Sequence, residues 1–128
     1  MNGSKKACLI IIVALVLVAI PLFAHHGTSA FDMTKRTTVK GTVTAVEWSN
    51  PHVFVHFDVN DGKGDTENWA ADSPNPTRLA KAGWNKDTLK LGDQVTATGN
   101  RAKNGSNLMR LAKIVRANGQ ELTGYTHF

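Results

Sequence analysis

Two histidines on one face of a predicted strand are the first residues in this chain whose types and spacing suggest chemistry. Valine or phenylalanine occupies every second position of residues 53–59, which is the period-two pattern of a half-buried strand. One face of this strand is predicted to be core, and the other carries His52, Phe54 and His56. Positions four residues apart on a strand lie about 13 Å apart, whereas a metal lies about 2 Å from each nitrogen that binds it. We therefore do not expect His52 and His56 to bind the same ion.

A second pair of histidines follows directly after an apolar segment near the N-terminus. Cleavage after Ala24 would make His25 the first residue, so that its α-amine and its imidazole are both offered to one ion. One imidazole from the folded domain would complete a three-nitrogen site, which resembles the histidine brace of copper proteins. Nitrogen donors without a thiolate suit Cu(II) or Zn(II), and copper binds more tightly at comparable sites. The expected metal is copper, and the candidate ligands are His25, His26, His52 and His56.

A plainer interpretation assigns these histidines no metal. The first two would belong to a polar arm after a signal boundary, His56 would lie on the surface, and His52 would cap an Asn-Pro corner. The cleavage site bears on this choice, because a cut after Ala30, with the small Thr28 three positions before it, removes both N-terminal histidines. We favour cleavage after Ala24, and both interpretations remain open.

The N-terminal segment has the pattern of a secretory signal. Lys5 and Lys6 precede an apolar run over residues 7–24, which is short for a membrane span and contains Pro21 near its end. We expect residues 1–24 to be removed and the protein to be periplasmic or secreted, with no stable membrane anchor. The single cysteine, Cys8, leaves with the signal, so the mature chain has no thiolate ligand and no disulfide.

Aromatic residues offer a second kind of binding surface. By parity Phe54 shares the outward face with the two strand histidines, and Asn50 and Trp48 lie beside it in sequence, so these three are the expected ligand-binding residues. Trp69 and Trp84 are further candidates for a stacking platform. Core filling is the simpler role for Trp48 and Trp84, because an indole buries a large apolar area.

Charge is distributed unevenly along the chain. Residues 41–72 hold six acidic residues and one basic residue, whereas residues 78–116 hold nine basic residues and two acidic ones. This pattern predicts two solvated faces of opposite sign, or alternatively a basic surface for an acidic partner or polyanion. Nucleic acid is not expected as a partner of an exported protein.

The order of predicted elements indicates an all-β domain with one short helix. Extended segments are predicted at 37–48, 52–60, about 66–71, 94–99, 108–115 and 121–123, with a helix after Pro76 that ends before Gly83. The parity of the first segment changes near Ala45, which predicts a bulge there, and Phe31 is expected to tuck into the core. Five strands with a helix after the third are typical of an oligonucleotide/oligosaccharide-binding (OB) barrel. A six-stranded open barrel or a small sandwich is the alternative.

Several motifs together carry a family resemblance. They are His25-His26-Gly27, the run Trp48-Ser49-Asn50-Pro51-His52, Gly83-Trp84, Leu91-Gly92-Asp93 and residues 101–106. With them the chain resembles an uncharacterised bacterial family of short exported proteins, the domain of unknown function sixty-one fifty-two. The resemblance implies export, a small OB-like barrel and His25 as the mature N-terminus, and it implies no activity.

Two hypotheses for function follow from the sequence. We expect a signal peptide over residues 1–24, an extended arm over 25–36 and an OB-like β-barrel domain over 37–128. The first hypothesis is a non-catalytic periplasmic binding module for copper or another divalent ion. The second is an accessory protein that docks on an envelope protein through Phe54 or the basic C-terminal half. No Ser/His/Asp arrangement or phosphate-binding glycine loop is present, so the protein is not expected to be an enzyme.

Overall fold

The computed structural model describes residues 27–126, and the predicted signal peptide lies outside this range. No helix within it is long and apolar enough to cross a membrane. One six-stranded sheet, one 3-10 helix and one α-helix make up the regular structure of these residues. In chain order the elements are η3 (Thr28–Ala30), β1 (Thr37–Glu47), β2 (Val53–Asn60), β3 (Thr66–Ser73), α1 (Pro76–Lys81), β4 (Gln94–Arg101), β5 (Leu108–Arg116) and β6 (Glu121–Thr123).

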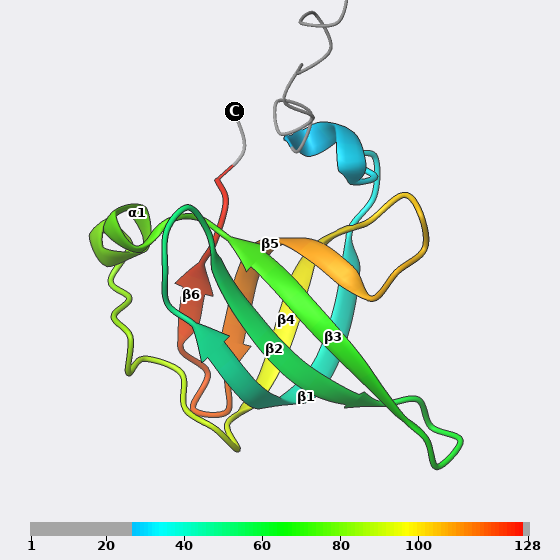
Figure 1. Ribbon diagram of the computed structural model, residues 1–128. Helices are drawn as coiled ribbons and strands as arrows, with labels where there is room; N and C mark the ends of the chain where they lie inside the picture. Colours follow the sequence, from blue (N-terminus) through cyan, green and yellow to red (C-terminus); the bar gives the residue numbers. More distant parts are fainter. Residues whose placement is uncertain (1–26, 127–128) are drawn as a thin grey trace, which may run out of the picture.

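The sheet closes on itself into a barrel. Its hydrogen-bonded order is β3-β2-β1-β4-β5-β6, and a further pairing joins β3 to β5 in parallel (Figure 1). The first five strands therefore form a closed barrel, and β6 extends the sheet beyond β5. This strand order, with a helix between β3 and β4, is that of an OB-fold. It confirms the predicted fold class and excludes the open barrel and the sandwich.

Strand β1 bends where the sequence predicts a bulge. It pairs with β4 through its first half and with β2 through its second half, and its register against β2 shifts between Val43 and Ala45. Gly41 lies in the bent part, where a Cβ would be 2.5 Å from the Asp58 carbonyl oxygen. A long strand can serve two partners in a small barrel only if it coils sharply, and glycine allows the neighbouring backbone to approach.

The barrel interior is filled by the alternating apolar residues of the strands. In β2, Val53, Val55 and Phe57 are fully buried, as the period-two pattern predicts. Trp84 is also buried, and its indole nitrogen donates to the Thr123 carbonyl oxygen at 3.0 Å. This bond satisfies the polar atom that a buried indole would otherwise leave without a partner.

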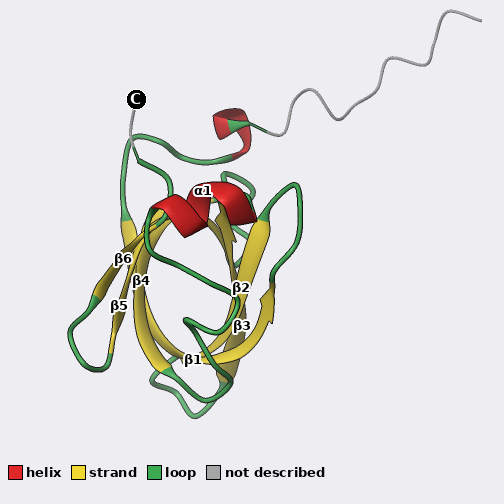
Figure 2. Ribbon diagram, turned by 90° about the vertical axis from the view of Figure 1, so that its left-hand side faces the viewer, coloured by secondary structure: helices red, strands yellow, loops and turns green. Residues whose placement is uncertain are grey.

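One end of the barrel is covered by α1 (Figure 2). The Asn75 side chain accepts a hydrogen bond from the Arg78 backbone N–H, so Asn75 is the N-cap, and Pro76 occupies the first helical turn. Gly83 adopts a φ of 91° just beyond the helix, a conformation that favours glycine. Leu79 projects from the helix and is fully buried in the core cluster.

The N-terminal arm is attached to the same end of the barrel. Phe31 is buried, as expected, and forms a β-bridge with Ala102. The buried Asn100 side chain donates to the carbonyl oxygens of Asp32 and Lys35 at 2.9 and 2.8 Å. These contacts fix the path of the arm over residues 31–35.

Strand β3 is longer than the sequence suggests, because it has a partner on each side. It runs to Ser73 rather than to Ala71. Asp72 pairs with Phe54 of β2 and with Arg110 of β5. Its last residues are therefore held in the sheet from both edges.

We expect Gly41→Ala to lower the free energy of unfolding by about 1–3 kcal/mol, the usual range for overpacking. The added methyl group would meet the Asp58 carbonyl oxygen and the Phe57 ring. Urea denaturation of both proteins measures the difference. Gly27→Ala is the matched control, because its Cβ would meet nothing within 4 Å. Equal losses in the two variants would contradict the proposed crowding at β1.

Candidate functional site

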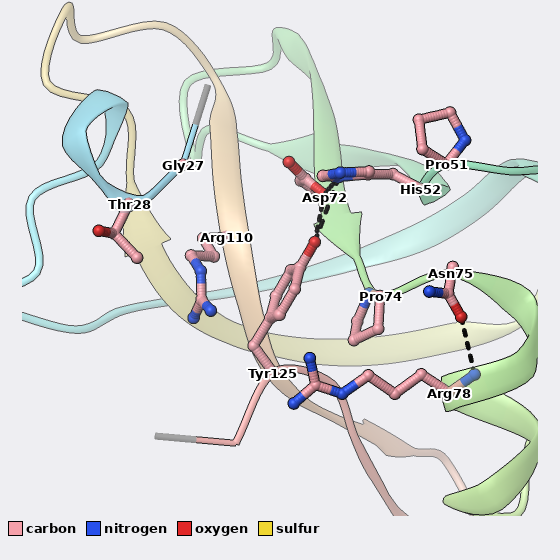
Figure 3. Close-up of a pocket in the computed structure, with 10 residues that line it drawn as sticks. All are labelled: Gly27, Thr28, Pro51, His52, Asp72, Pro74, Asn75, Arg78, Arg110 and Tyr125. Atoms are coloured by element: carbon pink, nitrogen blue, oxygen red, sulfur yellow. Dashed lines mark hydrogen bonds and ion pairs between the residues drawn. The ribbon is translucent and has the colours of Figure 1, made fainter. Parts of the chain in front are cut away.

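The described residues form a cavity of about 300 Å³ at the barrel end that α1 covers. Segments far apart in sequence supply its lining, as Figure 3 shows. They include the arm, the corner before β2, the end of β3, the start of α1, strand β5 and the tail after β6. The side chains that carry its chemistry are those of Thr28, His52, Asp72, Arg78, Arg110 and Tyr125.

His52 is held by a carboxylate and a phenol. Its Nδ1 lies 2.6 Å from Asp72 Oδ1 and 3.2 Å from the Tyr125 hydroxyl. Tyr125 donates from that hydroxyl to Asp72 Oδ1 at 3.0 Å and lies 3.2 Å from the Ser73 carbonyl oxygen. The Asp72 side chain is 13% exposed and that of His52 is 36% exposed. The pair therefore lies at the boundary between the protein interior and solvent.

This arrangement determines which nitrogen of His52 is available. An ionised carboxylate only accepts hydrogen bonds, so Nδ1 carries the proton and donates to Asp72. In the neutral ring Nε2 then bears the lone pair. Histidines that bind metals commonly have their other nitrogen held by a carboxylate in this way. His52 has the geometry of a ligand that is already oriented.

Burial and the negative charge of Asp72 make Tyr125 a weaker acid than an ordinary tyrosine. Desolvation is the largest cause that raises its pKa well above the ordinary 10.0, followed by the charge of Asp72 and the hydrogen bond to it. The charge of Arg110 acts in the opposite direction, and its guanidinium carbon lies 3.8 Å from the centre of the Tyr125 ring. The phenol therefore remains a hydrogen-bond donor throughout the neutral range.

The outward face of β2 has the composition that the sequence predicts. The Phe54 ring stacks between those of His52 and His56, with centroid distances of 6.3 and 6.4 Å. Phe54 is half-buried by these neighbours rather than fully exposed. His56 Nε2 lies 2.8 Å from Glu47 Oε2, and the Glu47 side chain is 61% exposed. The two strand histidines thus interact with different carboxylates.

The remaining predicted binding residues have varied surroundings. Trp48 is half-buried against the core, and Asn50 is exposed. Trp84 belongs to the core, as expected, but Trp69 is buried too and presents no open face for stacking. The roles of Trp48 and Asn50 in ligand binding stay predictions.

The proposed metal ligands lie partly outside the described residues. His25 and His26 precede residue 27, whereas Gly27 lines the same cavity as His52. Between residues 27 and 126 no group of three or more histidine, cysteine, aspartate or glutamate side chains could hold a metal ion. A three-nitrogen site would need ligands from the arm.

Sequence reasoning missed the partners of His52. In the sequence Asp72 and Arg110 stand out only as members of acidic and basic stretches, and no pattern points to Tyr125. One signal was present, because Asp72 interrupts an apolar strand end where a charge requires a partner. The identity of the residue that pairs with Asp72 depends on how the barrel closes.

The fold and the cavity define the class of protein to which this chain belongs. It is a small OB-like barrel with a polar cavity at one end. The chain is a member of the family of unknown function DUF6152, whose model matches residues 13–110. This membership confirms the resemblance found in the sequence. No match to a curated protein was found.

The single tyrosine permits a direct test of the site. In the folded protein the ultraviolet absorbance of tyrosinate should rise only at a pH well above 10.0, whereas in urea its midpoint should be about 10. Because the unfolded chain loses this proton first, the stability that Tyr125 contributes is present below pH 10 and is lost as the pH rises above it.

The control is denaturation of Tyr125→Phe at neutral pH and at a pH above 10. The variant should be about 1–3 kcal/mol less stable than the wild type at neutral pH, since it lacks a hydrogen bond to a charged group. It should also lose less stability on going to alkaline pH. Circular dichroism at each pH confirms that the protein is folded. Equal titration midpoints for folded and unfolded protein would contradict the part-buried hydrogen bond between Tyr125 and Asp72.

Proposed function

We propose that this protein is an exported, non-catalytic binding module for a divalent metal ion, Cu(II) in the first instance. His52 would be the ligand from the folded barrel, and His25 and His26 would supply the remaining nitrogens from the arm. The observation that carries the proposal is the His52–Asp72 pair, which directs Nδ1 toward the protein and leaves Nε2 for a ligand.

The position of the arm supports the same proposal. Gly27 lines the cavity beside His52, and His26 is the residue before it in the chain. A site assembled in this way needs one histidine from the barrel rather than two. His52 suits this role better than His56, whose Nε2 already faces a glutamate at the barrel surface.

The cavity also places a condition on the metal. Arg78 and Arg110 line it, and their positive charge opposes a bare cation. Binding would therefore depend on strong nitrogen donors, for which Cu(II) has the highest affinity among the common divalent metals. Because imidazoles bind metals in their neutral form, the affinity should fall as the pH is lowered.

Titration of the mature protein with Cu(II) and Zn(II) tests this function. Mass spectrometry first defines the N-terminus, and the metals are then removed. The wild type should bind Cu(II) with a Kd below about 10 μM, which corresponds to about 7 kcal/mol. Loss of one of the proposed nitrogen ligands should weaken binding at least about tenfold in His25→Ala and in His52→Ala.

His56→Ala is the matched control and should bind as the wild type does. Binding weaker than about 10 μM would overturn the proposal. Binding that survives both His25→Ala and His52→Ala would also overturn it, because the metal would then lie elsewhere.

A further inference from the structure

The charges that line the cavity are unbalanced. Two guanidinium groups, those of Arg78 and Arg110, line it together with one carboxylate, that of Asp72. Asp72 Oδ1 already accepts hydrogen bonds from His52 and Tyr125. In the described part of the chain neither arginine forms an ion pair with a carboxylate within 4.0 Å. The cavity therefore contains cationic donors that no carboxylate among residues 27–126 pairs with.

These two arginines repel each other. The pKa of Arg110 is lowered chiefly because the group is partly desolvated, and the positive charges of Arg36 and Arg78 contribute to the lowering. The interactions of Arg110 with Tyr125 and with Asp72 raise its pKa, and each of them is larger than the repulsion from Arg36 or from Arg78. An anion bound in the cavity would offset this repulsion more effectively than water does in a partly buried site.

The geometry holds one of these donors in place. The Arg110 guanidinium stacks 3.8 Å from the centre of the Tyr125 ring, and Tyr125 is itself fixed by Asp72. Arg78 approaches from α1 on the other side of the tyrosine (Figure 3). A planar guanidinium can donate two parallel hydrogen bonds to a carboxylate or a phosphate. Less side-chain entropy is lost on binding when the donor is already ordered.

Size restricts the ligand to a small molecule. The cavity volume of about 300 Å³ is at the lower end of the range for small-molecule sites, which is roughly 300–1,000 Å³. Thr28 and Asn75 add polar groups to its wall. Such a space has room for a small molecule.

We propose that this cavity binds a small oxyanion, a ligand with a carboxylate or a phosphate group, which accepts hydrogen bonds from Arg78 and Arg110 in its wall. This site is separate from the function proposed above and does not require a metal. The two are compatible, because an anion beside the arginines would reduce the electrostatic cost of placing a cation near His52.

Isothermal titration of the metal-free mature protein at low ionic strength tests the proposal. The probes are inorganic phosphate and succinate, and the stronger of the two identifies the preferred group. At least one should bind saturably with a Kd of about 1 mM or tighter. Arg78→Gln and Arg110→Gln should each weaken this binding at least about tenfold, the effect of losing a charged hydrogen bond.

Arg116→Gln is the matched control, because it removes the same charge from an arginine that lies outside the cavity and donates to Gln120. It should retain the wild-type Kd. Arg78 is exposed, so its replacement leaves the core intact, and circular dichroism checks the fold of the Arg110 variant.

Two results would overturn the proposal. One is the lack of saturable binding of either anion up to about 10 mM, which is about 3 kcal/mol. The other is an equal loss in Arg78→Gln and Arg116→Gln, since the attraction would then belong to the overall charge and not to the cavity. Because no metal is present, neither result bears on the metal titration.

Discussion

The parallel pairing between β3 and β5 is the constraint on which the rest of the structure depends. It joins β3, at one edge of the sheet, to β5, whereas all other neighbouring strands are antiparallel, and it places Asp72 opposite Arg110. Without it the apolar faces of the strands would have no enclosed interior, and the residues that line the cavity would lie at two separate edges. The closure of the core and the assembly of the site are therefore one event.

Asp72 transmits this closure to the chemistry of the cavity. A carboxylate that is 13% exposed would be costly to bury alone, and hydrogen bonds from His52 and Tyr125 offset that cost. In return its charge orients the imidazole and raises the pKa of the phenol. A single acidic residue thus sets the hydrogen-bonding state of two side chains that are 73 positions apart in the chain.

The cavity combines two kinds of binding group that are usually considered separately. His52 presents a nitrogen suited to a metal, and the arginines of α1 and β5 present donors suited to an anion. Asp72 interacts with both sets, because it accepts a hydrogen bond from His52 and its charge raises the pKa of Arg110. A ligand that brings both charges, or two ligands bound together, would be electrostatically better matched to this space than either ion alone.

The sequence by itself determined the strands, the bulge near Ala45, the helix after Pro76 and the outward face of His52, Phe54 and His56. These features depend on local periodicity and on turn residues, which are legible along a single stretch of chain. Only the tertiary structure decided that Asp72, Arg110 and Tyr125 surround His52. The alternation of apolar and polar residues tells which face of a strand a side chain occupies. It does not tell which strands meet when the barrel closes. Asp72 and Tyr125 are 53 positions apart and become partners only in the closed barrel.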